Sequence, residues 1–224
     1  EAGLRYPNYK LTKNIVELKT AIDEFNYPSK TIVIKPKNSR GGRGVTFLAG
    51  NENIPNWIGK GSRETILFKH PKEDQILIKL INSYKELLVM PLMKDPCYDI
   101  DVLSFNPNNC QVIMRKRHNP AGIPFQGNTI LFNSQLKNYC QEIVKTLNLD
   151  GFHDIDLMTN ENGEATFLEV NPRPSGSLCS SIAANFPIID QAILTKSGVD
   201  INLLNLNQYL QNEEINLKSN LFEV

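Results

Sequence analysis

The chain has 224 residues, with 24 basic and 24 acidic side chains and a formal net charge of zero. This balance excludes a general electrostatic attraction to nucleic acid or to an anionic membrane, and no apolar run approaches the roughly 20 residues that span a bilayer. Four cysteines without CxxC spacing argue against a zinc site or a disulfide framework. We therefore expect a reduced, cytoplasmic globular protein.

The first half of the chain predicts a mixture of helices and strands. Asn14 and Glu17 have the spacing of a capping box, and apolar residues then recur with helical period up to the dipeptide Tyr27-Pro28, which predicts a helix. Other apolar runs predict strands at 31–35, 44–48 and 87–90 and a short helix near 75–84.

The second half contains the clearest amphipathic helix, at 134–149, where apolar residues recur three and four positions apart. The other elements expected there are strands at 99–105 and 111–115 around the turn NPNN, helices at 177–185 and 188–194, and a Leu/Asn-rich tail at 200–224. A division near Pro91 separates two α+β units, residues 1–90 and 91–224. The predicted fold class is therefore α+β with two subdomains.

Residues 151–171 predict a β-hairpin, because polar and apolar residues alternate on both sides of Asn162-Gly163. Asn-Gly favours a two-residue type I′ turn, in which both central residues have positive φ. With that turn, Glu161 faces Glu164, and the pairing of all residues farther along the hairpin is set.

This pairing places Asp156 opposite Glu169 and Asp154 opposite Asn171. Two facing carboxylates repel each other, which destabilises a hairpin by a few tenths to about 1 kcal/mol, and a divalent cation between them reverses the sign of that interaction. Asp156, Glu169 and Asn171 offer the oxygen ligands that Mg²⁺ prefers. A solvated hairpin with acids on its outer face is the alternative, because strands with one wet face are common.

A glycine-rich segment, SRGGRGV at residues 39–45, lies between two predicted strands. This position excludes a Walker loop, which connects a strand to a helix and ends in Gly-Lys-Ser/Thr. A glycine hairpin can instead close its backbone N–H groups over phosphate oxygens. Lys35 and Arg43 flank the segment and would supply positive charge to the same polyphosphate.

Four segments together resemble the ATP-grasp superfamily, with carbamoyl-phosphate synthase-like and biotin carboxylase-like members as the nearest likeness: IKPKNSRGGRGV, LLVMPLM, GFHDIDLM and FLEVNPR. The resemblance runs from about residue 1 to residue 195. It implies that ATP lies between the two α+β units, under a glycine lid formed by Gly41, Gly42, Arg43 and Gly44. Lys35 would reach the α- and β-phosphates, and the carbonyl of Pro91 and the N–H of Met93 would hold adenine.

The resemblance also implies a chemistry. Asp156, Glu169 and Asn171 fall on the family's Mg²⁺-binding positions, which Mn²⁺ can also occupy, and Arg173 matches an arginine that steadies the transferred phosphate. Family members use Mg·ATP to activate a small-molecule carboxylate as an acyl phosphate, which an amine or another nucleophile attacks. Such phosphoryl transfer depends mainly on positioning and charge stabilisation.

The chain departs from the family pattern at two places. Cys97 stands where relatives carry a glutamate for the ribose hydroxyls, and Asp99, two residues on along the same strand face, could take that role. The N-terminal α/β domain that usually precedes this region is not in the sequence, so another domain or a second copy of the chain is a possible partner. Arg117, with Arg115 beside it in the run MRKRHN, is expected to touch the γ-phosphate or substrate, although short basic runs are usually solvated.

Two other classes of function remain open. A nucleotide-binding module that no longer catalyses would explain Cys97. A kinase-like phosphotransferase would also use a glycine hairpin, but HRD-like and DFG-like elements are missing. The acceptor and donor substrates depend on variable loops, so these residues do not specify them.

Overall fold

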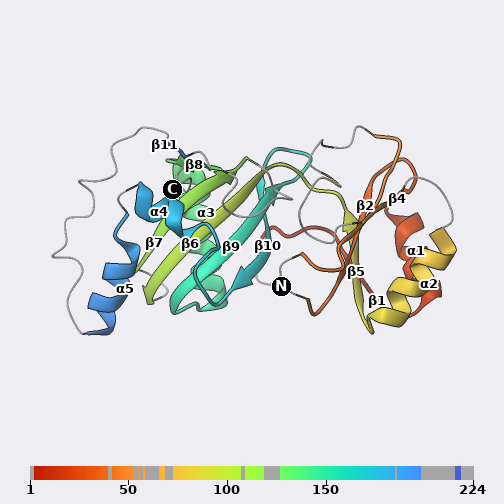
Figure 1. The fold of residues 1–224 in the computed structure, drawn as a ribbon, viewed down its shortest axis with the longest axis horizontal. Coiled ribbons are helices and arrows are strands. Elements are labelled where there is room, and N and C mark those ends of the chain that lie inside the picture. Colours follow the sequence, from red (N-terminus) through yellow and green to blue (C-terminus); the bar gives the residue numbers. More distant parts are fainter. Residues whose placement is uncertain are drawn as a thin grey trace, which may run out of the picture. The chain divides into compact units, whose positions relative to one another are not determined.

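The computed structural model describes residues 3–39, 42–52, 55, 58, 66–68, 73–106, 109–118, 127–184, 186–197 and 215–217. The chain forms two compact units (Figure 1). The N-terminal unit contains Pro7–Met93 and Pro120–Ile123, and the C-terminal unit combines Glu1–Tyr6 with Lys94–Asn119 and Pro124–Val224. The boundary therefore lies close to Pro91. Among the described residues, no helix has the length and hydropathy needed to cross a lipid bilayer.

The N-terminal unit is a five-stranded sheet with the order β1-β5-β2-β3-β4. Its elements are β1 (Lys10–Thr12), α1 (Ile15–Glu24), β2 (Ile32–Pro36), β3 (Thr46–Leu48), β4 (Ile66–Phe68), α2 (Glu73–Ser83) and β5 (Leu87–Pro91). The two helices pack together on one face of the sheet, where Leu18 and Leu77 meet Ile32 and Ile34 in a shared apolar core (Figure 1). Asn14 caps α1 as its spacing with Glu17 predicted, since the N–H of Glu17 donates to Asn14 Oδ1 at 2.9 Å, while Glu17 Oε2 accepts the N–H of Lys13 instead of that of Asn14.

The C-terminal unit is a six-stranded antiparallel sheet with the order β10-β9-β6-β7-β8-β11. Its strands are β6 (Lys94–Asn106), β7 (Asn109–Arg117), β8 (Asn128–Leu131), β9 (Gly151–Thr159), β10 (Ala165–Asn171) and β11 (Ile215–Leu217). Its helices are α3 (Ser134–Leu147), α4 (Leu178–Ala183) and α5 (Ile188–Lys196). The three helices expected in this half are thus present, whereas β6 begins five residues before the expected start at 99.

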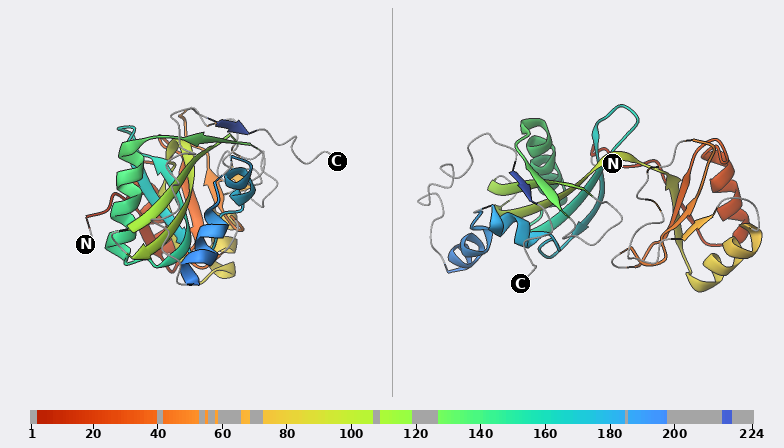
Figure 2. Two further views of the ribbon diagram at one scale, coloured as in Figure 1. Left: turned by 90° about the vertical axis from the view of Figure 1, so that its left-hand side faces the viewer. Right: turned by 45° about the horizontal axis from the view of Figure 1, so that its top comes forward.

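Helices cover both faces of this sheet (Figure 2, left). One face packs against α3, where Ile100, Val102 and Ile155 meet buried residues of the helix. The opposite face carries a second apolar cluster, in which Leu103 and Ile113 pack with Phe186 and other residues of the α4–α5 region. Because side chains alternate along a strand, the odd-numbered residues Asp99 and Asp101 of β6 lie on this second face.

The β9–β10 hairpin forms, but its turn differs from the expected two-residue type I′ turn. Asn160 N–H donates to the carbonyl of Glu164, which leaves a three-residue loop closed by Gly163 at φ 79°. The side chain of Asn160 holds this loop, because its Oδ1 accepts the N–H groups of Asn162 and Glu164, each at 2.9 Å. Glu161 therefore does not face Glu164, and the expected turn type was wrong.

Beyond the loop, the ladder contains a β-bulge between Phe167 and Glu169. The longer loop shifts the pairing by one residue, since Ala165 pairs with Thr159, and the bulge shifts it back. As a result, Asp156 pairs with Glu169, as the sequence predicted.

Candidate functional site

Acidic side chains form two rows across neighbouring strands of the C-terminal sheet. In the first row, Asp156 on β9 pairs with Asp99 on β6 and with Glu169 on β10. In the second row, Asp154 pairs with Asp101 on one side and with Asn171 on the other. The strand register therefore brings together carboxylate and amide groups that are up to 72 positions apart in the chain (from Asp99 to Asn171).

The centre of these rows has the composition of a cation site. One carboxylate oxygen from each of Asp99, Asp154 and Asp156 lies within 4.8 Å of the other two. Asp154 is only 4% exposed, and its Oδ1 has no hydrogen-bond partner among the described residues. A buried carboxylate oxygen without a partner is costly, and oxygen donors are what Mg²⁺ or Mn²⁺ binds. The residues present therefore fit a hard divalent cation.

The pKa values of two of these acids reflect the same crowding. Burial, followed by the charge of Asp99, raises the pKa of Asp154 to about 7, although Arg173 acts in the opposite direction. Burial and then the charges of Asp154, Asp99 and Glu169 raise the pKa of Asp156 well above its ordinary value. A cation bound beside them would favour the ionised forms and lower both pKa values.

A fully buried arginine lies at the β7 end of the rows. The Arg115 side chain is 0% exposed; its Nη2 donates to Asp99 Oδ1 at 2.7 Å and its Nη1 donates to Asp101 Oδ2 at 2.5 Å. Nη1 also donates to the hydroxyl of Ser181 on α4. Sequence reasoning placed Arg115 in a basic run beside Arg117 and did not identify this cluster, because its partners are distant in sequence.

Asp99 is buried within this cluster. Its Oδ2 accepts a hydrogen bond from the Ser177 hydroxyl at 2.6 Å. Burial raises the pKa of Asp99, but the charge of Arg115 and hydrogen bonds from serines and Arg115 outweigh it and lower the pKa to about 2. With 3% exposure and both oxygens engaged, Asp99 is poorly placed for ribose hydroxyls, and we assign it to the buried cluster instead.

The segment after β10 places Arg173 beside the second row. Arg173 Nη1 donates to Asp154 Oδ2 at 2.8 Å, while the arginine side chain remains 55% exposed. Asn171 Nδ2 donates to Glu169 Oε1 at 3.3 Å, which links the last two polar residues of β10. Arg173 is therefore anchored to Asp154 at the edge of the acidic rows and still reaches solvent.

Two further residues lie near Asp156 of the first acidic row: Arg117 on β7 and Cys97 on β6. Arg117 is partly buried on β7, and by strand alternation it faces the same side as Arg115. Cys97 is 7% exposed on β6, and burial followed by the negative charge of Asp156 raises the pKa of its thiol to about 12. The thiol of Cys97 is therefore neutral near pH 7 and does not act as a nucleophile.

The predicted phosphate-binding residues belong to the N-terminal unit. Lys35 on β2 is partly buried, and it points away from the helix-covered face that holds Ile32 and Ile34. No ion-pair partner of Lys35 occurs among the described residues, whereas Lys37 pairs with Glu86 at 2.7 Å. The ammonium group of Lys35 is therefore more available to a bound anion than that of Lys37.

Residues 42–44 of the glycine segment form a turn before β3. Gly42 and Gly44 have φ values of 74° and 76°, which glycine adopts readily and other residues adopt rarely. A Cβ atom on Gly44 would lie 2.6 Å from the Tyr84 hydroxyl and 2.9 Å from Pro36 Cγ. Arg43 is exposed between the two glycines, and Gly41 lies outside the described residues.

The expected adenine-binding segment lies at the end of β5. Pro91 pairs with Ile32, and the N–H of Leu92 donates to the carbonyl of Thr31 at 2.9 Å. Pro91 and Met93 are each partly buried, and Met93 is the last residue of the N-terminal unit before β6.

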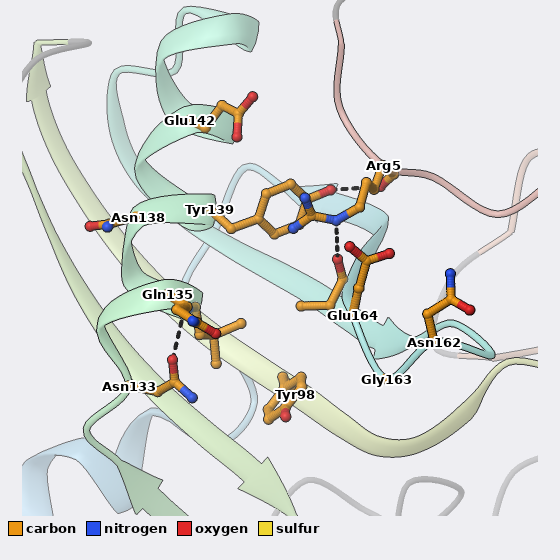
Figure 3. Close-up of a pocket in the computed structure, with 12 residues that line it drawn as sticks. Arg5, Tyr98, Asn133, Gln135, Asn138, Tyr139, Glu142, Asn162, Gly163 and Glu164 are labelled. Carbon is orange, nitrogen blue, oxygen red and sulfur yellow. Dashed lines mark hydrogen bonds between the residues drawn. The ribbon is translucent and has the colours of Figure 1, made fainter.

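A separate pocket of about 580 Å³ opens on the α3 face of the C-terminal sheet (Figure 3). Tyr98 lines it and precedes Asp99 on β6, so the pocket and the acidic rows are on opposite faces. The guanidinium of Arg5 stacks on the Tyr139 ring at 4.1 Å, and Arg5 Nε donates to the carbonyl of Ala165 at 3.1 Å. The sequence showed no pattern that indicated this pocket.

The chain is similar to known proteins in both sequence and fold. Residues 83–216 match the model of a family described as ATP-grasp in the biosynthetic pathway with Ter operon. No curated protein sequence matches the chain.

Solved structures extend the similarity to the fold of nearly the whole chain. An N5-carboxyaminoimidazole synthetase from Staphylococcus aureus in complex with ADP is 16% identical, with a TM-score of 0.64 over 96% of this chain and 50% of that one. A biotin carboxylase from Campylobacter jejuni is 16% identical, with a TM-score of 0.62 over 86% and 42%. The D-Ala:D-Ser ligase VanG from Enterococcus faecalis is 17% identical, with a TM-score of 0.53 over 79% and 50%.

The chain thus spans half or less of the length of these structures. At such identities the likeness concerns the fold. The family model, however, covers more than half of this chain, from the end of α2 through β11, and includes every residue of the acidic rows. The chain therefore belongs to the ATP-grasp family.

Proposed function

We propose that this protein binds Mg·ATP and uses it to activate a carboxylate as an acyl phosphate, which an amine or a similar nucleophile then attacks. The observation that carries this proposal is the aligned set Asp156, Glu169 and Asn171, beside the unpartnered buried oxygen of Asp154. Each of these groups offers oxygen to a hard cation. The structural neighbours include a D-Ala:D-Ser ligase and an L-amino acid ligase, which supports the same general class of reaction here.

The metal-binding role belongs to the β9–β10 hairpin. Asp156, Glu169 and Asn171 would hold Mg²⁺ or Mn²⁺, which supplies positive charge to the phosphates of the nucleotide. Glu169 is exposed and Asp156 is partly exposed, so both are accessible from solvent. Their carboxylates repel each other without a cation; burial first, and then the charges of Asp154, Asp99 and Glu169, raise the pKa of Asp156.

Positive side chains would complete the phosphate site. Arg173, held by Asp154 but half exposed, would contact the transferred phosphoryl or acyl phosphate with its free guanidinium nitrogens. Arg117, on the same sheet face, would contact the γ-phosphate or the carboxylate substrate. Planar guanidinium groups suit such bidentate contacts with oxyanions.

The N-terminal unit would bind the remainder of ATP. Lys35 would contact the α- and β-phosphates, and the N–H groups of the glycine turn at Gly42 and Gly44 would cover them. Backbone groups of Pro91 and Met93 would receive adenine. Small-molecule carboxylates and amines are the proposed substrates.

A metal-binding test separates this function from a solvated acidic hairpin. Glu169→Gln should weaken the affinity for Mg·AMPPNP, a non-hydrolysable ATP analogue, by at least about tenfold in calorimetry, because it removes a charged metal ligand. The melting temperature should change little, since Glu169 is exposed. Glu161→Gln, at the exposed tip of the same hairpin, is the matched control, and equal affinities of the two variants would contradict the proposed metal site.

An ATP-binding module without catalysis is the second candidate, and the surroundings of Cys97 favour it. The acid that could replace the ribose-binding glutamate, Asp99, is buried in the Arg115 cluster. Incubation with Mg·ATP and panels of carboxylates and amines distinguishes the two functions. Release of ADP and phosphate that depends on a carboxylate supports the ligase, and tight Mg·ATP binding without turnover on any panel supports the module.

A further inference from the structure

The buried cluster around Arg115 connects three parts of the C-terminal unit. The guanidinium joins Asp99 and Asp101 on β6 to Ser181 on α4, while Arg115 itself belongs to β7. A buried guanidinium between two carboxylates is expensive to desolvate, and such groups often contribute more to a unique arrangement than to stability. The segment that this cluster holds in place is the connection between β10 and α4.

The two acids of the cluster hold the connection between β10 and α4. Asp101 Oδ1 accepts the backbone N–H of Ser175 at 2.9 Å, and Asp99 Oδ2 accepts the hydroxyl of Ser177 at 2.6 Å. The N–H of Ser177 in turn donates to Ser175 Oγ at 2.9 Å. Both serines are buried, so the loop of residues 172–177, here called the anchor loop, is fixed at two points.

The anchor loop begins directly after Asn171 and contains Arg173. The backbone N–H of Arg173 donates to the carbonyl of Asn171 at 2.8 Å, and its guanidinium donates to the carbonyl of Pro174 at 2.8 Å. Arg173 thus lies between the end of β10 and the first anchored residue, Ser175. The contacts of Ser175 and Ser177 with the acids therefore limit the positions that the Arg173 backbone can take.

We propose that Arg115 is a positioning residue for the phosphate site: through Asp99 and Asp101 it fixes the anchor loop and so holds Asn171 and Arg173 where they meet the metal and the transferred phosphate. This inference rests on the proposed function and adds a role that differs from direct contact. Arg115 is 0% exposed and its terminal nitrogens are engaged by Asp99, Asp101 and Ser181, so it acts through these residues.

The positions of the cluster also explain its charge state. The carboxylates of Asp99 and Asp101 raise the pKa of Arg115 further above its ordinary range despite burial. Against the cost of burial, the charge of Arg115 and hydrogen bonds from the serines and Arg115 lower the pKa of Asp99, which favours its ionised form.

Ser177→Ala tests the inference, because it removes one anchor and leaves Arg115 paired with both acids. Calorimetry should be carried out with AMPPNP in the presence of Mg²⁺ and again with EDTA. The affinity for Mg·AMPPNP should fall by about tenfold, which corresponds to the loss of one hydrogen bond to a charged group. The affinity for AMPPNP with EDTA should fall clearly less, since only the contact of Arg173 with the phosphate is then disturbed and the metal contact of Asn171 is absent from both proteins. A general loss of structure would weaken both affinities.

Ser104→Ala is the matched control. Ser104 is also a buried serine of the C-terminal sheet, but its hydroxyl donates to the carbonyl of Asn106, away from the cluster. Both affinities of this variant should equal those of the wild type. Arg115→Lys is a second variant, which retains the charge but loses the fork that reaches two acids, and it should show the same selective loss as Ser177→Ala.

The results for these variants distinguish the positioning role of Arg115 from the proposed function. If Glu169→Gln weakens Mg·AMPPNP binding but Ser177→Ala and Arg115→Lys bind it as the wild type does, the positioning role is wrong and the proposed function stands. If the three variants and the wild type show no dependence on Mg²⁺, the proposed function fails and the inference fails with it. Equal losses with Mg²⁺ and with EDTA would reduce Arg115 to a purely structural role.

Discussion

The two carboxylate oxygens of Asp154 have different surroundings. One oxygen is paired with Arg173, and the other is buried without a partner among the described residues. The folded protein therefore raises the pKa of this acid to about 7. In the unfolded chain the pKa of an aspartate is about 3.9, so the folded form binds the proton more strongly between these two values.

This difference predicts how stability depends on pH. Where the native state binds more protons, the free energy of unfolding falls as pH rises, so the contribution of protonated Asp154 is complete below about pH 4 and is lost as pH rises through about 7. One pKa unit corresponds to about 1.4 kcal/mol, or a melting temperature change of about 3–6 °C for a chain of this size.

The measurement is the melting temperature of wild type and Asp154→Asn between pH 5 and 7.5. The wild type should lose stability relative to the variant as pH rises, and millimolar Mg²⁺ should reduce that loss by stabilising the ionised acid. A difference between the two proteins that stays constant with pH would show that Asp154 does not retain its proton in the folded state.

The two lysines near the glycine turn should differ in their effect on ATP. Lys35 has no ion-pair partner among the described residues, whereas Lys37 is paired with Glu86 on the surface. Lys35→Ala should weaken ATP binding by about tenfold or more, the equivalent of about 1.4 kcal/mol, while Lys37→Ala should change it less than about twofold because exposed pairs contribute little. Titration calorimetry of both variants measures their affinities for ATP. Equal losses would contradict a specific contact between Lys35 and the phosphates.

At the scale of single elements, the glycine turn makes a prediction about stability. Gly44 combines a positive φ with close neighbours on both sides, Tyr84 and Pro36. Gly44→Ala should therefore reduce the free energy of unfolding by about 2–3 kcal/mol, from backbone strain plus steric overlap. Urea unfolding measures the difference.

Gly163→Ala is the control for backbone strain alone. Gly163 has a similar φ of 79°, but a Cβ atom there would meet nothing within 4 Å. This variant should lose only about 1 kcal/mol. Equal losses for both variants would mean that the contacts with Tyr84 and Pro36 relax without cost.

The β9–β10 hairpin shows how far the sequence predicts an element. Counting outward from the predicted two-residue turn placed Asp156 opposite Glu169, and the structure has this pairing, because a bulge offsets the longer loop. The predicted turn type was wrong. The side chain of Asn160 accepts two hydrogen bonds from the loop backbone and stabilises a loop of three residues instead of two. The bulge before Glu169 has no local signature in the sequence, yet it restores the predicted pairing.

The Arg115 cluster marks the limit of such prediction. In sequence, Arg115 belongs to a short basic run, and the usual interpretation of a basic run is a solvated surface. Its burial depends on Asp99, Asp101 and Ser181, which are 16, 14 and 66 positions away. Only the strand order of the sheet brings these partners together. The amphipathic helix α3, in contrast, depends on contacts that its own periodicity reveals.

At the scale of the whole molecule, a net charge of zero conceals a local excess of acid. The two rows gather Asp99, Asp101, Asp154, Asp156 and Glu169 in one sheet, whereas composition alone indicated no preference for a charged ligand. Averages over the chain describe long-range attraction. They do not describe a site that the sheet assembles from three strands.

Similarity to known proteins is also distributed unevenly. The family model begins at residue 83 and therefore matches the C-terminal unit, which holds the acidic rows, while the structural likeness extends over 96% of the chain. The role proposed for Lys35 and the glycine turn thus depends on fold and local motif, whereas the role proposed for the acidic rows also has sequence support. The nucleotide-binding experiments on the N-terminal unit are for this reason the more demanding tests.

The bulge between Phe167 and Glu169 has a consequence for how such a hairpin can evolve. A two-residue turn with a regular ladder and a three-residue turn with one bulge lead to the same neighbours for Asp156 and Asp154. Two different hairpin tips can therefore place Asp156 and Asp154 opposite the same partners. Selection for the positions of Asp154 and Asp156 would act on the end of the hairpin away from the turn. The length of the turn could then change, provided that a bulge elsewhere in the ladder restores the pairing.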